Sequence, residues 1–321
     1  LESNHVDVDT ERFPRTISAT GLLDDGGDRV PGVFSYTLAQ PQWEDGASAD
    51  RLIGLPGEEN VMLQRNGTML YPEGTTLAKT LYITESGKTG YTRLETQVMF
   101  LENEQWNFYT YAWREDQTDA DLVPAEGGLR KIVVDDVLAF GGKREIEWRY
   151  HSRSECRTCH NSRATVLGFV LPQLNAYSGK PGEDHRGQVH GLVEEGVIQL
   201  VNAVGGKENA HSVEGLSKDL PEFHNGLSSD KEAIVKSYLA ANCSHCHRPS
   251  GGGNATIDLQ YQTGWENMKL INHRPTRGSF GIQDARIVSA GDPTGSILLY
   301  RLSTGGLGHM PHLGSRTPDW M

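Results

Sequence analysis

Basic residues and long apolar runs are both scarce in this sequence. Thirty Lys and Arg residues stand against 42 Asp and Glu residues, which gives a formal net charge of −12 at pH 7. Nucleic-acid binding requires clustered basic side chains, so this composition excludes a nucleic-acid partner. No apolar run approaches the roughly 20 residues of a transmembrane helix, and the first five residues lack the pattern of a signal peptide. We therefore predict no transmembrane segment in this chain.

Cysteine is rare as well, because the chain has only four and two copies of one pentapeptide contain them all. The copies are Cys156-Arg157-Thr158-Cys159-His160 and Cys243-Ser244-His245-Cys246-His247. Cys-x-x-Cys-His is the attachment sequence of a c-type haem. In that chemistry the two thiols form thioethers with the porphyrin vinyl groups, and the histidine binds the iron.

Three other uses of paired cysteines fit this pattern less well. A zinc site would need a second pair within about 15–20 residues, or a nearby pair of histidines, and these pairs lie far apart. A thioredoxin-like pair would need a βαβ setting, and a disulfide gives no reason for the repeated histidine. We therefore predict two covalent haem c groups with their irons, one bound through Cys156 and Cys159 and the other through Cys243 and Cys246.

Residues 1–147 are predicted to form a β-rich domain. Short runs of β-branched and aromatic residues alternate with turn dipeptides such as Asn66-Gly67. The expected strands lie at 61–64, 80–83, 95–101 and 108–113, and their spacing favours an antiparallel, sandwich-like domain. The acidic cluster at 24–28 could bind calcium, but it lacks the ligand order of an EF-hand loop, so a solvated turn is the simpler interpretation.

Helices and glycine-rich loops are expected after Trp148. Residues 188–201 have apolar residues at helical spacing, and the capping box Ser229-Asp230-Lys231-Glu232 predicts that another helix begins at Ser229. Residues 250–281 are predicted to form an irregular loop around a cofactor. The predicted fold class is thus α+β multidomain. Its β domain is followed by two mainly α, cytochrome-c-like haem domains at 148–228 and 229–321, the second without its closing C-terminal helix.

The second haem domain has the motif order of a small c-type cytochrome. His247 is the expected proximal ligand of its iron, and Met310, which is followed by a proline late in the chain, is the expected distal ligand. A thioether ligand stabilises ferrous iron and raises the reduction potential. The alternatives are a methionine that only fills a gap in the core, or ligation by the neighbouring His309 or His312.

The distal ligand of the first haem is left open by the sequence, although His160 is its expected proximal ligand. Leu220 stands where a methionine loop would place its methionine, and leucine cannot bind iron. The iron is then five-coordinate, or it binds one of the histidines His224, His190, His185, His211 and His151. Bis-histidine ligation would lower the potential of this haem, whereas an open site would bind small ligands or peroxide.

Strings along most of the chain resemble a family of bacterial two-haem c-type cytochromes with a conserved β-rich N-terminal region. They include LAQPQWEDGASADRLIGL at 38–55, YPEGT at 71–75, RLET at 93–96, YAW at 111–113, DQTDA at 116–120, QLN at 173–175, YLAANCSHCHRP at 238–249, GDP at 291–293 and SIL at 296–298. The resemblance implies a periplasmic or extracellular redox protein, exported with a leader that this chain lacks. The sequence differs from the family at His151 and His312, where proline is expected.

Three functions are compatible with these patterns. The first is an extracytoplasmic diheme cytochrome that carries electrons from a protein donor to a protein acceptor. The second is a diheme peroxidase-type enzyme with an open distal site at the first haem. The third is a haem subunit whose β domain docks in a larger electron-transfer assembly. No catalytic side chains are predicted, because no residue spacing supports a Ser-His-Asp set or a pair of carboxylates.

Overall fold

The computed structural model describes residues 13–24, 29–136, 139–161, 165–174, 187–201, 223–224 and 228–319. The chain divides into two compact units, each built from separate stretches of sequence. Unit 1 comprises Leu1–Ser35, Ser48–Glu58 and Glu73–Ser154, and unit 2 comprises Tyr36–Ala47, Glu59–Pro72 and Glu155–Met321. Two short stretches that precede residue 73 therefore belong to the C-terminal unit. The division into three domains stays a prediction.

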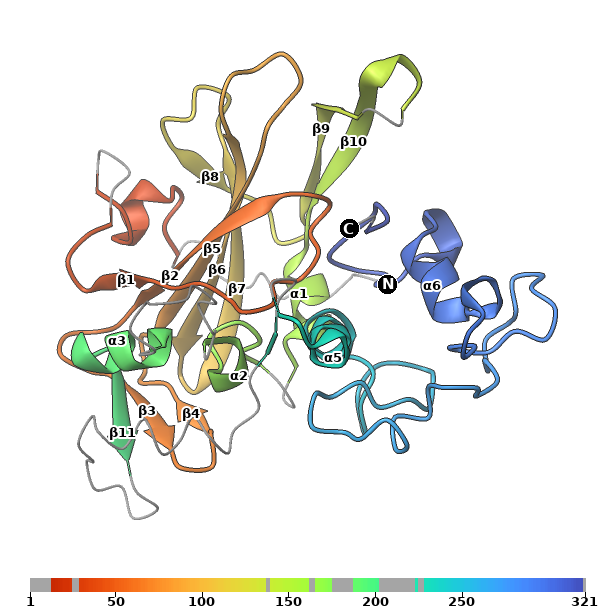
Figure 1. Ribbon diagram of the computed structural model, residues 1–321. Helices are drawn as coiled ribbons and strands as arrows, with labels where there is room; N and C mark the ends of the chain where they lie inside the picture. The colour runs from red at the N-terminus through yellow and green to blue at the C-terminus, as the bar shows by residue number, and fades with distance from the viewer. Residues whose placement is uncertain are drawn as a thin grey trace, which may run out of the picture. The chain divides into compact units, whose positions relative to one another are not determined.

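Unit 1 contains a six-stranded sheet in the order β1-β2-β5-β6-β7-β8, in which every neighbouring pair is antiparallel (Figure 1). The strands are β1 (Val33–Ser35), β2 (Ser48–Gly54), β5 (Thr76–Ile83), β6 (Thr92–Glu102), β7 (Gln105–Trp113) and β8 (Ala120–Leu122). The runs predicted at 80–83, 95–101 and 108–113 lie within β5, β6 and β7, so these three strands are confirmed.

The hairpin between β6 and β7 turns through Asn103 and Glu104, whose φ values are 53° and 60°. Two successive residues with positive φ are typical of a tight type I′ turn, which matches the twist of the two strands. The carboxylate of Glu73 accepts hydrogen bonds from the backbone N–H groups of both turn residues, at 2.8 and 2.6 Å. This side chain therefore satisfies the two donors that the turn leaves open.

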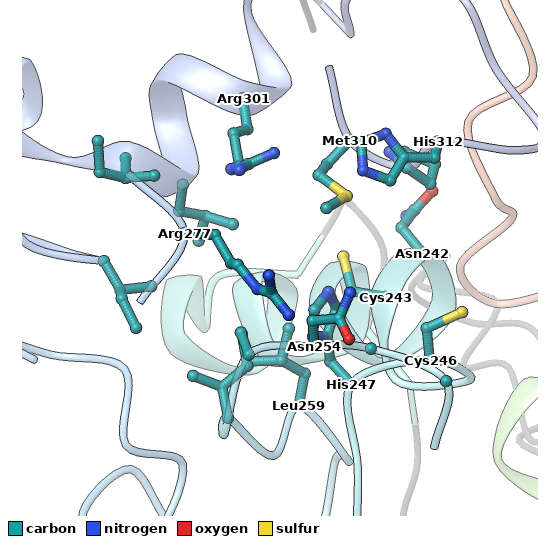
Figure 2. Close-up of a pocket in the computed structure, with 18 of the residues that line it drawn as sticks. Asn242, Cys243, Cys246, His247, Asn254, Leu259, Arg277, Arg301, Met310 and His312 are labelled. Carbon is teal, nitrogen blue, oxygen red and sulfur yellow. The ribbon is translucent and has the colours of Figure 1, made fainter. Parts of the chain in front are cut away.

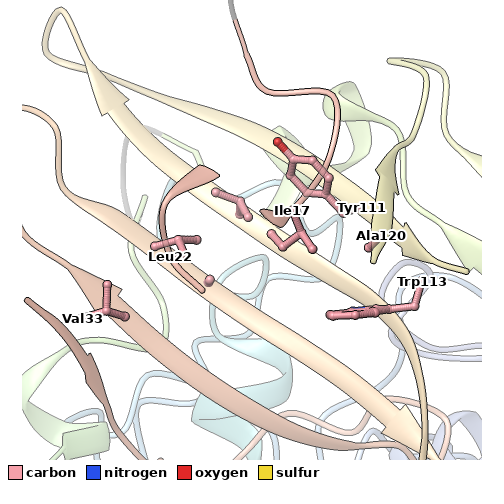
Figure 3. Close-up of a cluster of buried hydrophobic side chains, with 8 residues drawn as sticks. Ile17, Leu22, Val33, Tyr111, Trp113 and Ala120 are labelled. Atoms are coloured by element: carbon pink, nitrogen blue, oxygen red, sulfur yellow. The ribbon is translucent and has the colours of Figure 1, made fainter. Parts of the chain in front are cut away.

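A cluster of buried apolar side chains packs against the sheet of unit 1 (Figure 3). Its members are Ile17, Leu22, Val33, Ala78, Val98, Tyr111, Trp113 and Ala120. The indole N–H of Trp113 donates a 2.9 Å hydrogen bond to the Thr96 hydroxyl, and the guanidinium of Arg93 lies 3.7 Å from the centre of its ring. The one polar atom of this buried side chain is thus satisfied.

Unit 1 also holds an antiparallel ribbon of two strands and two short 3-10 helices. The ribbon pairs β9 (Gly128–Asp135) with β10 (Lys143–Tyr150), and the 3-10 helices are η2 (Ser18–Thr20) and η3 (Phe140–Gly142). Buried and exposed residues alternate along much of both strands. This two-residue period is what a strand with one covered face requires.

Unit 2 combines short helices with a small mixed sheet. The sheet has the order β11-β3-β4, in which β11 (Ile198–Val201) runs parallel to β3 (Val61–Gln64), and β3 runs antiparallel to β4 (Met69–Leu70). The helices are α2 (Leu171–Leu174), α3 (Gln188–Glu194), α5 (Lys231–Cys243), α6 (Ile297–Leu302), η5 (Pro293–Gly295) and η6 (Gly306–Gly308). Helix α1 (Arg153–Cys159) begins with the last two residues of unit 1 and continues in unit 2. None of the helices in the described part of the chain has the length and apolar character needed to cross a membrane.

The predicted fold class is wrong. The described residues are mostly β, in sheets of six, three and two strands, and the five α-helices among them are too few and too short to build two mainly α domains. The longest of these helices, α5, has 13 residues. Within 250–281 the described backbone forms turns and bends without a helix, as the irregular-loop prediction expected. Residues 250–281, which follow the second Cys-x-x-Cys-His sequence, are therefore loops, and the next helices begin only at η5 and α6.

The helix predicted over 188–201 is correct only in its first half. Helix α3 ends at Glu194, Gly196 follows in the left-handed region with a φ of 76°, and the chain continues as β11. Glycine adopts this conformation without steric cost, so it is a natural helix terminator. The β-branched residues beyond it pair with β3, which lies more than 130 positions earlier in the sequence. This distant partner was not visible in the helical spacing.

Candidate cofactor site

Helix α5 delivers the second Cys-x-x-Cys-His sequence to its place in unit 2. The cap of this helix is Asp230, one residue after the predicted cap Ser229, and its side chain accepts a hydrogen bond from the Ala233 N–H at 3.0 Å. Its buried face includes Leu239, which packs in a cluster with Leu259, Met268 and Leu270. The helix ends at Cys243, so its packing fixes the start of the motif.

A cavity of about 410 Å³ opens beside this helix end (Figure 2). Cys243, Cys246 and His247 line it from the motif, and Met310 lines it from a segment more than 60 residues later. Pockets that bind cofactors and small molecules have volumes of about 300–1,000 Å³. The structure thus brings these four predicted site residues, together with Cys159 of the first motif, around one space of suitable size. Their roles as haem ligands stay predictions.

The charged side chains in this cavity wall are cationic. Arg277 and Arg301 line the cavity, and no Asp or Glu is among the described residues around it. In Figure 2, Arg277 and Arg301 lie to the left of Cys243 and Cys246. Burial lowers the pKa of Arg301, whose guanidinium donates to the Gly308 carbonyl at 3.3 Å and lies 4.7 Å from the Phe280 ring centre. An anionic group at the arginine side would compensate these charges.

His247 has the properties of a neutral metal ligand. Burial is the main cause that lowers the pKa of its imidazole, which favours the uncharged form that binds metals. Its Nδ1 atom is buried and has no hydrogen-bond partner among the described residues. A Cβ atom at Gly253 would stand 2.6 Å from Nδ1, so only glycine lets the backbone pass so close to the ring.

The two thiols of the second motif differ in their surroundings. Burial raises the pKa of the Cys243 thiol to about 12, so this group stays protonated while it is free. Hydrogen bonds from Cys159 and then from His245 lower the pKa of the Cys246 thiol. A thioether has no proton to lose, so covalent attachment would remove both effects.

The segment around Met310 is held by the buried histidine that precedes it. His309 bonds through Nδ1 to the Thr304 carbonyl at 2.9 Å and through Nε2 to the Ser315 hydroxyl at 3.2 Å. Both ring nitrogens are engaged and the side chain does not line the cavity, so His309 acts here as an anchor rather than as a rival ligand. His312 does line the cavity and stays an alternative to Met310.

Sequence reasoning missed a second anchor, which residues 43–45 provide and which we call the anchor segment. The Trp43 N–H donates to the Asn242 side chain at 2.8 Å, and its indole N–H donates to the Thr317 carbonyl at 2.9 Å. Asp45 Oδ1 accepts hydrogen bonds from the Arg316 N–H, the Thr317 N–H and the Thr317 hydroxyl at 2.8, 2.7 and 2.8 Å. One short segment thus ties the residue before Cys243 to the chain that follows Met310. The WEDG string within 38–55 was the only signal of it.

The first motif lies on α1, which carries Cys156 and Cys159 and ends just before His160. The Nδ1 atom of His160 lies 2.7 Å from the Thr165 carbonyl oxygen. Because a carbonyl only accepts hydrogen bonds, Nδ1 must carry a proton. Metal-binding histidines are commonly oriented in this way by a backbone carbonyl. His160 thus has the orienting contact that is common among metal-binding histidines, and its role as a ligand stays a prediction.

The histidines predicted as distal ligands of the first haem do not reach the described cavity. The His224 ring lies 3.0 Å from the Ser228 hydroxyl, and its backbone N–H donates to Ser237 at 2.7 Å. His190, on α3, lies 3.5 Å from the Glu194 carboxylate. Their ligand roles stay predictions. Other sequence candidates lie outside the described residues: Leu220, His185, His211 and most of the acidic cluster at 24–28.

The two motifs meet each other in unit 2. Three potential metal ligands come together here, namely the Sγ atoms of Cys159 and Cys246 and a ring nitrogen of His245. These atoms lie within 4.8 Å of one another, a spacing that could hold a metal ion. The Arg248 guanidinium also donates to the Asn161 side chain at 3.1 Å. Two cysteine pairs far apart in the sequence are therefore neighbours in the structure, which their spacing alone did not indicate.

A scan against protein-family models returns no match, and searches of curated proteins and of solved structures return none either. No family or fold relationship is therefore shown, and function must be argued from the chemistry of the site.

Proposed function

We propose that this protein is a diheme c-type cytochrome that transfers electrons between protein partners in the periplasm or outside the cell. The observation that carries the proposal is the single cavity lined by Cys243, Cys246, His247 and Met310. These residues are the two attachment points and the two axial ligands that a c-type haem needs. Helix α5 positions Cys243, and the segment that His309 anchors positions Met310.

The rest of the cavity wall suits a haem as well. Haem has an apolar ring, with its vinyl groups and its two propionates on different sides. The cavity combines apolar residues such as Leu259 and Leu298 with two cysteines and, to their left in Figure 2, two arginines. Arg277 and Arg301 would bind the propionates, and the thiols would bind the vinyl carbons. The bound group would supply one-electron redox chemistry.

The first haem would be attached through Cys156 and Cys159, with His160 as its proximal ligand. The support is the hydrogen bond between His160 Nδ1 and the Thr165 carbonyl, which orients the imidazole ring. The strongly acidic charge of the chain favours a redox partner that presents a basic patch. Docking in a larger electron-transfer assembly would use the same two haems.

The test is the haem content of protein produced with c-type haem maturation. After denaturation and acid–acetone extraction, pyridine haemochrome absorbance should correspond to two haems per chain. The double variant C243A/C246A and the matched variant C156A/C159A should each retain one. Polypeptide that retains no haem would overturn the proposal, and a value of two in either variant would overturn the assignment of that site.

A zinc centre is the second candidate, and the triad Cys159, His245 and Cys246 favours it. Zinc binds thiolate and imidazole ligands, and a three-residue site leaves one position open. Metal analysis of the same preparation separates the two candidates. One zinc per chain with four titratable thiols would support zinc, whereas two haems with no free thiol would exclude it.

A further inference from the structure

We infer that equivalent residues of the two attachment motifs contact each other. The haems bound to these motifs would then meet at their thioether edges and form one electronically coupled pair. This inference rests on the proposed function and specifies how its two sites cooperate.

The fourth residue of each motif provides the first observation. Cys159 and Cys246 each close a Cys-x-x-Cys pair, and their sulfur atoms lie within 4.8 Å of one another, together with a ring nitrogen of His245. Each sulfur is the atom that would bond to the edge of its own porphyrin. The attachment points of the two rings are therefore as close as neighbouring side chains in a packed core.

The residue that follows each motif provides an independent observation. Asn161 follows His160, Arg248 follows His247, and their side chains share the 3.1 Å hydrogen bond. Asn161 and Arg248 are 87 positions apart in the sequence, and so are Cys159 and Cys246. Equivalent positions of the two motifs therefore contact each other. Contacts between equivalent positions are the mark of a self-complementary interface.

The cavity wall provides a third observation. Thr158 and Cys159 from the first motif line the cavity that contains Cys243, Cys246 and His247. A group bound in this cavity would thus touch the first motif directly. An electron that leaves ferrous iron at one site would reduce ferric iron at the other, with no proton or further reactant, and it would cross between the adjoining thioether edges.

Circular dichroism in the Soret region tests this arrangement on the protein with both haems. Two haems in contact should give a bisignate signal, because their strong transitions mix. The single-haem variants C156A/C159A and C243A/C246A should each give a signal of one sign, and the sum of the two should not reproduce the wild-type spectrum. A wild-type spectrum equal to that sum, from protein with two haems per chain, would overturn the inference and leave the proposed function standing.

The half-reduced wild-type protein gives a second measurement that needs no variant to fold. Reduction of one haem moves its absorption away from that of the other, so the bisignate amplitude should fall by more than half at the midpoint. An amplitude that only follows the sum of oxidised and reduced spectra would overturn the inference. Protein without covalent haem would overturn both this inference and the proposed function, and haemochrome absorbance measured first identifies that case.

Discussion

Replacing Asp45 by alanine should destabilise unit 2 more than any other single change in the anchor segment. The Oδ1 atom of Asp45 accepts three hydrogen bonds between 2.7 and 2.8 Å, all from Arg316 and Thr317, and only 8% of the residue is exposed. Asp45 also has a φ of 56°, in the left-handed region. Alanine would therefore lose the acceptor and would adopt an unfavourable backbone conformation.

The expected loss follows from these two effects. A hydrogen bond to a charged group contributes about 1.5–3 kcal/mol. Three bonds to one oxygen are not additive, so the acceptor as a whole contributes about 3 kcal/mol. The left-handed conformation costs an L-residue about 1 kcal/mol. D45A should thus lower the free energy of unfolding by about 4 kcal/mol in total.

The matched control is D45N. Asparagine keeps an oxygen acceptor at the same place and tolerates the left-handed region, so D45N should lose only about 1 kcal/mol, the order of a single weakened hydrogen bond. Equilibrium unfolding in urea, followed by far-UV circular dichroism, measures both values at unchanged slope. Equal losses in the two variants, or a loss below about 1 kcal/mol in D45A, would refute the reasoning.

Three further substitutions test the two units separately. M310L keeps the side-chain volume but removes the sulfur, so low-temperature electron paramagnetic resonance should lose one His/Met low-spin signal; an unchanged spectrum would show that Met310 is not a ligand. R301Q removes a cation beside the proposed haem, so potentiometric titration should give a lower potential for that haem, and an unchanged or higher value would contradict a propionate contact. W113F loses the hydrogen bond to Thr96 and part of a buried ring, so urea unfolding should show a loss of about 2 kcal/mol, and a loss below about 0.5 kcal/mol would count against this core.

Local patterns in the sequence were sufficient for several elements of this protein. The runs at 80–83, 95–101 and 108–113 are strands in the structure, and the capping sequence at 229–232 located the cap of α5 to within one residue. The Cys-x-x-Cys-His repeats and the Met-Pro sequence selected five residues that line one cavity, namely Cys159, Cys243, Cys246, His247 and Met310. These signals act over a few residues, because periodicity, capping and turn chemistry depend on near neighbours.

Contacts between distant residues were decided only by the tertiary structure. Residues 198–201 form a strand because their backbone pairs with that of β3, and no pattern within 188–201 indicates this partner. The anchor segment joins Trp43 to Asn242 across 199 positions and to Thr317 across 274. The meeting of Cys159 with Cys246 has the same origin. Such contacts form where packed surfaces fit each other, and the sequence next to each residue does not identify its distant partner.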